Sequence, residues 1–325
     1  MNLQNGLIAE FTEQSYTQII FPHAKTDWIN YLQEAQKTFV NIINAIRIYQ
    51  TCKVICYNIS EVKKYFPDET NLLFVEYETN DTWARDCSAL SVVKDGKQEL
   101  LNFTFNAWGN KFEATKDTAM TAFLTPNALT YDFVLEGGAV ESNGNGVILT
   151  TSACMLNPNR NPHLNNTQIT QRLKEYFDAD TILYLNHGYL AGDDTDSHID
   201  TLARFINKDT IMYVQCKDKK DGHYKELRLM EEELQAIAKE YNFELIALPM
   251  AEAVYEGEER LPATYANFLF VNGAVLVPTY GTDTDEKVIR IFENTFPTRD
   301  IIPIECSILI YQHGSLHCVT MNVTH

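Results

Sequence analysis

The 325-residue sequence lacks the features of a secreted, membrane or nucleic-acid-binding protein. No window approaches about eighteen uninterrupted apolar residues, and the first residues hold no basic segment followed by an apolar one. Basic residues are also few, because 26 Lys and Arg stand against 44 Asp and Glu, for a net charge of −18. Such a field repels nucleic acid and anionic membrane and attracts small cations. We therefore expect a cytoplasmic protein with neither of those partners.

The seven cysteines indicate neither a disulfide framework nor structural zinc. They are odd in number and spread widely along the chain, and no CxxC pair occurs, although Cys52 and Cys56 bracket one predicted strand. One of them, Cys318, follows a glycine-bearing turn with polar neighbours, in the stretch Gln312-His313-Gly314-Ser315-Leu316-His317-Cys318. A reactive thiolate is placed in this way, within reach of substrate and of cations that lower its pKa. Cys318 is the candidate nucleophile; a buried, inert cysteine is the alternative.

The composition is that of one globular domain. Hydrophobic residues make up 45% and charged residues 22% of the chain. Since no linker or low-complexity segment divides the sequence, a single catalytic domain over residues 1–325 is expected.

Apolar periodicity predicts a mixed α/β fold. Helices are predicted to begin near residues 30, 116, 167, 227 and 285, with Asp27 as the cap of the first. The last three starts are about sixty residues apart. Five strand-strand-helix-strand units closed in a ring would explain this repeat, and an ordinary mixed sheet with accidental spacing is the alternative. The expected strands are 54–57, 72–75, 100–105, 133–135, 147–151, 182–185, 211–214, 244–248, 268–271, 275–277 and 301–304.

The densest polar stretch spans residues 192–205. If it is extended, Asp194, Asp196, His198 and Asp200 share one face, with three carboxylates around one imidazole. Carboxylates raise the pKa of a neighbouring histidine, which suits a general acid near neutral pH. A solvated acidic loop and a metal site are the alternatives, although the spacing lacks the glycine and distal glutamate of a calcium-binding EF-hand loop.

Two further clusters carry suitable chemistry. Glu136 precedes Gly137 and Gly138, and this double glycine lets a ligand approach the backbone closely. Trp83 and Asp86 combine an aromatic face with a carboxylate, which can bind a planar cation. Each also has a structural explanation: a turn for the glycines, core packing for Trp83, and an ion pair with its neighbouring arginine for Asp86.

Together these stretches resemble the agmatine deiminases, close to the bacterial peptidyl-arginine-deiminase-like branch of the guanidine-modifying superfamily. The resemblance covers nearly the whole chain and implies the five-bladed α/β propeller (pentein) fold. The matching segments, in the family's order, are Trp83-Ala84-Arg85-Asp86, Phe105-Asn106-Ala107-Trp108-Gly109, Glu136-Gly137-Gly138, His198-Ile199-Asp200, Tyr265-Ala266-Asn267-Phe268 and Gly314-Ser315-Leu316-His317-Cys318.

The resemblance also implies the roles of eight side chains. Cys318 would be the nucleophile, His198 the acid and base, Glu136 its companion, Asp86 and Asp200 the pair that grips a guanidinium, Trp83 and Trp108 the pocket lining, and Asp194 a further substrate contact. The chain departs from the family at Cys87-Ser88-Ala89, where Gly-Pro is usual, and in having the single Gly314 before Cys318. These departures concern the rim of the pocket and the packing of the tail loop.

The implied reaction hydrolyses agmatine to N-carbamoylputrescine and ammonia through a covalent amidino-cysteine, a step toward putrescine, with no metal or organic cofactor. The implied partner is a small cationic guanidino substrate, and the implied assembly is a homodimer. Three rivals remain: a deiminase of free, peptidyl or methylated arginine; a non-catalytic binder of polyamines or guanidines; and a metal-dependent hydrolase using the acidic residues around His198. His317 is expected to be structural, because neighbours on a strand face opposite sides.

Overall fold

The computed structural model describes residues 4–324, which form several small mixed sheets with helices around them. Five sheets each hold an antiparallel strand pair beside a parallel pair. Their strand orders are β19-β2-β3-β4, β1-β5-β6-β7, β8-β9-β10, β11-β12-β13 and β16-β17-β18, and β14-β15 is a separate hairpin. The strands are β1 (Gly6–Leu7), β2 (Tyr16–Ile20), β3 (Thr51–Cys56), β4 (Leu72–Glu76), β5 (Leu90–Lys94), β6 (Lys97–Thr104), β7 (Leu129–Val134), β8 (Glu141–Ser142), β9 (Val147–Thr151), β10 (Thr181–Leu185), β11 (Ala203–Asn207), β12 (Thr210–Gln215), β13 (Glu244–Pro249), β14 (Tyr255–Glu256), β15 (Glu259–Arg260), β16 (Leu269–Val271), β17 (Ala274–Thr279), β18 (Asp300–Glu305) and β19 (Thr320–Val323).

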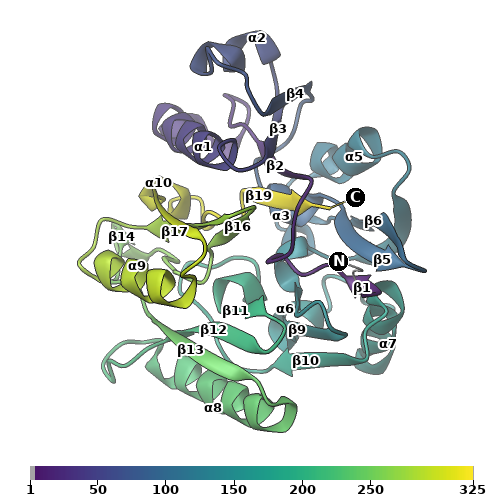
Figure 1. Cartoon of the computed structure of the whole chain (residues 1–325), viewed down its shortest axis with the longest axis vertical. Coiled ribbons are helices and arrows are strands. Elements are labelled where there is room, and N and C mark those ends of the chain that lie inside the picture. Colours follow the sequence, from purple (N-terminus) through teal and green to yellow (C-terminus); the bar gives the residue numbers. More distant parts are fainter. Residues whose placement is uncertain (1–3, 325) are drawn as a thin grey trace.

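A helix connects the parallel strands of each of the five sheets, because parallel neighbours need a long crossover. The connecting helices are α1 (Leu32–Ile46), α5 (Thr115–Leu124), α7 (Asn166–Phe177), α8 (Tyr224–Tyr241) and α9 (Thr284–Thr295). Figure 1 shows α8 and α9 at the periphery of the molecule, outside their sheets. The remaining α-helices are single turns: α2 (Ile59–Val62), α3 (Ala84–Cys87), α4 (Ala107–Asn110), α6 (Ser152–Met155) and α10 (Ser307–Ile310).

The predicted helices are confirmed, since all five connecting helices lie where the apolar periodicity placed them. Helix α1 illustrates the reason: Ala35, Phe39, Ile42 and Ile46 recur at spacings of three and four and are fully buried. The predicted cap is wrong. Asp27 instead begins a 3₁₀ turn, Asp27–Tyr31, that runs into α1.

The expected strands 133–135 and 147–151 belong to different sheets. The run that ends at Val134 is β7, which pairs in parallel with β6. The partner of β9 across the Asn143–Gly146 turn is instead the two-residue strand β8, with Glu141 opposite Leu149. Two residues are too short to give a periodic signal, so the sequence did not reveal β8.

Both ends of the chain join sheets near the middle of the molecule. Strand β19 pairs with β2, so that Thr320 lies opposite Ile19, and β1 pairs with β5. The segment between β1 and β2 crosses the centre of the view in Figure 1. No helix within residues 4–324 is long and apolar enough to cross a bilayer.

Candidate active site

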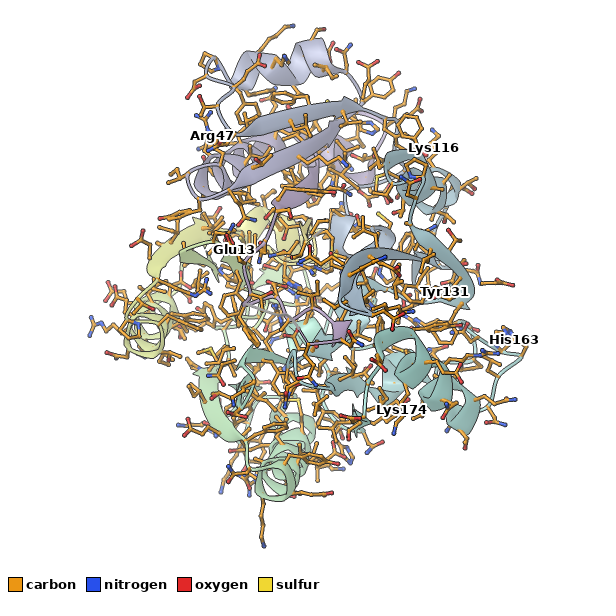
Figure 2. The ribbon with its side chains drawn as sticks, turned by 45° about the vertical axis from the view of Figure 1, so that its right-hand side comes forward. Glu13, Arg47, Lys116, Tyr131, His163 and Lys174 are labelled. Carbon is orange, nitrogen blue, oxygen red and sulfur yellow. The ribbon has the colours of Figure 1, made fainter. Side chains whose placement is uncertain are left out.

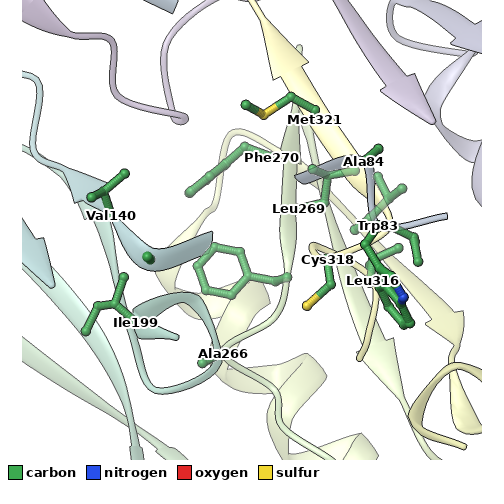
Figure 3. Packing of buried hydrophobic residues seen from close by; sticks show 14 of the residues in the cluster. Trp83, Ala84, Val140, Ile199, Ala266, Leu269, Phe270, Leu316, Cys318 and Met321 are labelled. Carbon is green, nitrogen blue, oxygen red and sulfur yellow. The ribbon is translucent and has the colours of Figure 1, made fainter. Parts of the chain in front are cut away.

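Cys318 lies in the turn just before β19, where hydrogen bonds hold the backbone on both sides. Thr320 donates its hydroxyl to the carbonyl of Leu316, and the Arg85 N–H donates to the carbonyl of Cys318 at 3.1 Å. The Asn267 Oδ1 atom accepts from the backbone N–H groups of His317 and Cys318, and it lies 3.3 Å from Cys318 Sγ. Figure 3 shows the sulfur in the buried cluster near Trp83. Asn267 belongs to a quoted motif, but the sequence assigned it no role.

The thiol of Cys318 differs from the expectation of a cysteine activated by nearby cations. Only 5% of the residue is exposed. Burial, and then the charges of Asp200 and Asp86, raise the pKa of Cys318 well above its usual value. The unliganded site therefore favours the neutral thiol, and a positive ligand between these carboxylates would favour the thiolate.

His198 precedes the 3₁₀ turn Ile199–Thr201 and is 1% exposed. Its Nδ1 lies 3.6 Å from Asp86 Oδ1. Burial alone would lower the pKa of His198, but Asp86, Cys154 and Glu136 outweigh it and raise the pKa well above the usual range. The imidazole is therefore placed to hold a proton near neutral pH.

The reading of residues 194–200 as one extended face is wrong. Asp196 and Ser197 adopt left-handed backbone conformations, with φ of 65° and 66°, which turn their side chains out of register. The Asp196 carboxylate contacts Arg160 at 2.8 Å and Lys111 at 3.0 Å instead of the imidazole. Two of the carboxylates near His198, Asp86 and Glu136, are far from it in sequence, and a third, Asp200, is only two residues away.

Asp86, in helix α3, is buried and held on both oxygens. Trp108 donates its indole N–H to Oδ2 at 2.9 Å, and the Gly138 N–H donates to Oδ1 at 3.0 Å. The left-handed backbone of Trp108 (φ 54°) turns the chain sharply at that point. Burial raises the pKa of Asp86 to about 6, with His198 opposing that shift and Asp200 adding to it.

Asp200, in the 3₁₀ turn after His198, is fully buried and has one free oxygen. Its Oδ2 lies 2.6 Å from His317 Nδ1 and 4.0 Å from Cys318 Sγ. Within residues 4–324, its Oδ1 has no hydrogen-bond partner. Burial would raise the pKa of Asp200, but His317 and His198 outweigh it and lower the pKa below the usual value. A buried, ionised oxygen without a partner is suited to a cationic ligand.

Glu136 is fully buried and paired with Arg160, which the sequence reading missed. The Arg160 Nε donates to both Glu136 oxygens, at 2.9 and 3.0 Å, and its Nη2 donates to the Thr195 carbonyl. A ligand atom of Glu136, one of Cys154 and one of His198 all lie within 4.8 Å of one another, a spacing that a metal ion could use. Because Arg160 already neutralises the carboxylate, this group fits an acid–base site better than a dication site.

A cavity of about 450 Å³ opens beside Cys318 and is mostly aromatic and acidic. Four predicted residues, Asp86, Asp194, Trp83 and Trp108, line it together with Cys318, whereas Asp200, His198 and Glu136 are not among the lining residues. The other acidic residues lining it are Asp27, Asp81, Glu113 and Asp117. Burial and neighbouring charges raise the pKa of Asp81 to about 8, and burial raises that of Asp117 to about 7. A cation bound here would favour the ionised forms of both.

Comparison with known proteins agrees with this geometry. The family of Porphyromonas-type peptidyl-arginine deiminases matches residues 6–323. The chain belongs to this family. A solved structure of a cysteine-to-serine variant of C. jejuni agmatine deiminase with substrate bound has a TM-score of 0.95 at 41% identity, over 99% of this chain and 97% of that chain.

Two other relatives also match nearly the whole length of this chain. A Porphyromonas gingivalis structure has a TM-score of 0.94 at 44% identity, over 99% of each chain. The agmatine deiminase of Ectopseudomonas mendocina is 27% identical over 346 residues, which is 96% of this chain and 93% of that protein. Membership of the peptidyl-arginine deiminase family therefore rests on the whole chain and not on a shared motif.

Proposed function

We propose that this protein is a hydrolase that converts agmatine to N-carbamoylputrescine and ammonia through a covalent intermediate on Cys318. The observation that carries the proposal is a pair of buried carboxylates near Cys318. Asp200 Oδ2 lies 4.0 Å from Cys318 Sγ, the other oxygen of Asp200 has no hydrogen-bond partner within residues 4–324, and Asp86 lines the same acidic cavity as Cys318. Two carboxylates on a planar guanidinium fix the position of its central carbon relative to the sulfur.

The first half of the reaction uses Cys318 and His198. The guanidinium, bound between Asp86 and Asp200, lowers the raised pKa of the thiol, which releases its proton to solvent. The thiolate then forms a C–S bond to the guanidinium carbon as the C–N π electrons move to nitrogen. His198 then gives its proton to a terminal nitrogen as the C–N bond breaks, and ammonia leaves. An amidino-thioether remains on the enzyme.

The second half returns the enzyme to its starting state. Neutral His198 takes a proton from water as the water oxygen bonds to the amidino carbon, and the C–S bond then breaks. The remaining hydroxyl proton passes to the sulfur as the neutral ureido product leaves, which restores the thiol and the protonated His198. Glu136, held by Arg160, contributes to the raised pKa of His198 and so favours the protonated imidazole.

The cavity favours agmatine over free arginine. Agmatine carries an ammonium at its far end, where free arginine also carries a carboxylate. Carboxylates outnumber cationic side chains among the residues that line the cavity, with Lys25 the only lysine or arginine. Attraction of the ammonium and repulsion of a carboxylate act in the same direction. Solved agmatine deiminases at 41% and 25% identity, from C. jejuni and Enterococcus faecalis, support this choice.

We also propose that the five sheets close into one ring, the five-bladed α/β propeller, within a single catalytic domain. The shared pattern of an antiparallel pair, a crossover helix and a parallel strand in every sheet supports it. Cys318, His198 and Asp86 follow or precede strands of different sheets, so a ring would bring them to its centre.

The decisive experiment measures the intact mass of protein quenched during turnover of agmatine. An adduct of one amidino group with its carbon chain, confined to the carboxyl-terminal peptide with Cys318, is the expected result. A parallel assay of ammonia release from agmatine, arginine, methylated arginine and a peptidyl arginine separates the rival deiminases. Turnover of arginine without turnover of agmatine would overturn the substrate assignment, and ligand binding without any turnover would indicate a silent binder.

A further inference from the structure

Glu10 is a buried carboxylate that the proposed mechanism does not use. It lies on the segment between β1 and β2, and its side chain is 8% exposed. It lines a small cavity of about 50 Å³ together with Arg85 and His317, and it is not among the residues that line the substrate cavity. Glu10 therefore contacts the site through His317 and not through the substrate cavity.

Glu10, His317 and Asp200 form a continuous row. The Glu10 Oε2 atom lies 2.5 Å from His317 Nε2, and His317 Nδ1 lies 2.6 Å from Asp200 Oδ2. Each contact needs one proton between its two atoms, and because Glu10 and Asp200 are ionised, both protons lie on the His317 ring. Burial, Arg204 and Arg85 lower the pKa of His317, and the contacts with Glu10 and Asp200 oppose that shift. The imidazole ring is thereby fixed at both nitrogens, and its orientation sets the orientation of the Asp200 carboxylate.

Further contacts fix Glu10 itself. The Arg204 Nη2 atom lies 2.9 Å and the Arg85 Nη2 atom 3.3 Å from Glu10 Oε2, and the Phe270 N–H donates to Oε1 at 3.0 Å. Burial would raise the pKa of Glu10, but Arg204, His317 and Arg85 hold it well below the usual value. The carboxylate is thus ionised and rigidly held before any substrate arrives.

The row ends at the oxygen of Asp200 that has no hydrogen-bond partner within residues 4–324. The second oxygen of Asp200 is the buried atom without a partner, and it lies on the same carboxylate that His317 holds. A carboxylate held by one oxygen still turns unless its partner is fixed. Glu10 supplies that fixation, because His317 has no other side-chain hydrogen bond among residues 4–324 than those to Glu10 and Asp200.

We propose that Glu10 is a positioning residue for the deiminase reaction, acting through His317 to orient Asp200 toward the guanidinium beside Cys318. The proposal rests on the proposed function for its catalytic consequence. Its alternative is that Glu10 only anchors the amino-terminal segment to Arg85 and Arg204.

The test compares Glu10→Gln with Glu13→Gln. Glutamine keeps the size of Glu10 but loses its charge, whereas Glu13, labelled in Figure 2, is an exposed residue of the same segment whose loss removes the same charge. Glu10→Gln should lower kcat for agmatine by about 10- to 100-fold, since a misplaced catalytic contact costs that much, and Glu13→Gln should leave kcat unchanged. Anchoring alone would instead lower the melting temperature of Glu10→Gln and leave kcat unchanged, which would overturn the proposal.

A double-mutant cycle with His317→Gln tests whether Glu10 acts through the imidazole. The double variant should be within about twofold of His317→Gln alone, because the second substitution then removes nothing further. Independent, multiplicative losses would overturn the proposal. Should Glu10→Gln not fold, Glu10→Asp is the second variant, because it keeps the charge but moves it one methylene away from His317. An unchanged kcat in Glu10→Asp would count against positioning.

A measurement without turnover separates this proposal from the proposed function. The imidazole N–H protons of His317 should give proton NMR signals far downfield, absent in His317→Gln and displaced in Glu10→Gln. A wild-type protein that releases no ammonia from any guanidine would refute the function, while these signals would still show the row. If Glu10→Gln leaves these signals unchanged, the contact between Glu10 and His317 is refuted.

Discussion

Gly138 packs against His198 so closely that no side chain fits between them. A Cβ at residue 138 would lie 2.6 Å from His198 Nδ1 and 3.1 Å from Asp200 Oδ2. The glycine of the Glu136-Gly137-Gly138 motif is therefore required by the space around the imidazole. The same residue donates its N–H to Asp86, so one position sets the spacing of the acid–base and binding groups.

Gly138→Ala should lower kcat by about 100-fold, because the methyl group pushes the imidazole or Asp200 away from its working position. The measurement is steady-state ammonia release, with circular dichroism to show that the fold is retained. Gly222→Ala is the matched control, since a Cβ there meets no heavy atom within 4 Å and the backbone is not left-handed. Full activity of Gly138→Ala would contradict the placement of His198.

Cys318→Ala should abolish turnover and retain agmatine binding. The carboxylates and aromatic side chains of the cavity remain, while the attacking atom is lost, so we expect a fall in kcat of roughly 10⁴-fold or more. Calorimetry with agmatine measures the binding that remains. Cys216→Ala, a cysteine that the site does not contain, should behave as the wild type. Residual turnover near the wild-type rate would exclude Cys318 as the nucleophile.

The acid limb of kcat/KM should follow Asp86. Its pKa is raised to about 6, so the carboxylate is ionised above that pH and is lost as a cation partner below it. We expect kcat/KM to fall below about pH 6, with a slope that approaches tenfold per pH unit. Trp108→Phe removes a hydrogen bond that lowers this pKa, so its acid limb should move to higher pH. A shift to lower pH would show that another group sets the limb.

Binding of the substrate should weaken with salt. Asp27 and Glu113 are exposed at the cavity and attract a cation through solvent, where added ions screen the attraction. The KM for agmatine should rise between low and physiological ionic strength with little change in kcat. Asp27→Asn combined with Glu113→Gln should raise KM about two- to fivefold at low salt and flatten the salt dependence. An equal salt dependence of KM in the wild type and the double variant would show that the ammonium of agmatine does not lie near Asp27 and Glu113.

Removal of metal ions should leave activity intact. The proposed steps use only protein groups and water, and Arg160 neutralises Glu136, the carboxylate of the potential ligand set that also holds Cys154 and His198. Dialysis against a strong chelator, followed by an assay in metal-free buffer, measures this. Loss of activity that zinc restores would favour the metal-dependent hydrolase.

The helices were the most predictable part of this fold. Their signal is local, because a buried stripe such as that of α1 repeats every three or four residues within one segment. Strand pairing was less predictable: β7 and β9 are close in sequence, yet they belong to different sheets because the short strand β8 lies between them. The eight candidate residues were found by motif, and the structure places five of them, Trp83, Asp86, Trp108, Asp194 and Cys318, at one cavity.

The amino-acid sequence by itself determined the helices, the acidic charge, the family resemblance and the candidate reacting groups, since each depends on neighbouring residues or on residue type. Only the tertiary structure decided that Asp196 turns away from His198, that Arg160 holds Glu136, that burial keeps Cys318 a thiol, and that Glu10 contacts His317. Those contacts join different loops, and Glu10 and His317 are 307 positions apart. Their charges interact strongly because packing excludes water from the space between them, and no local pattern encodes that exclusion.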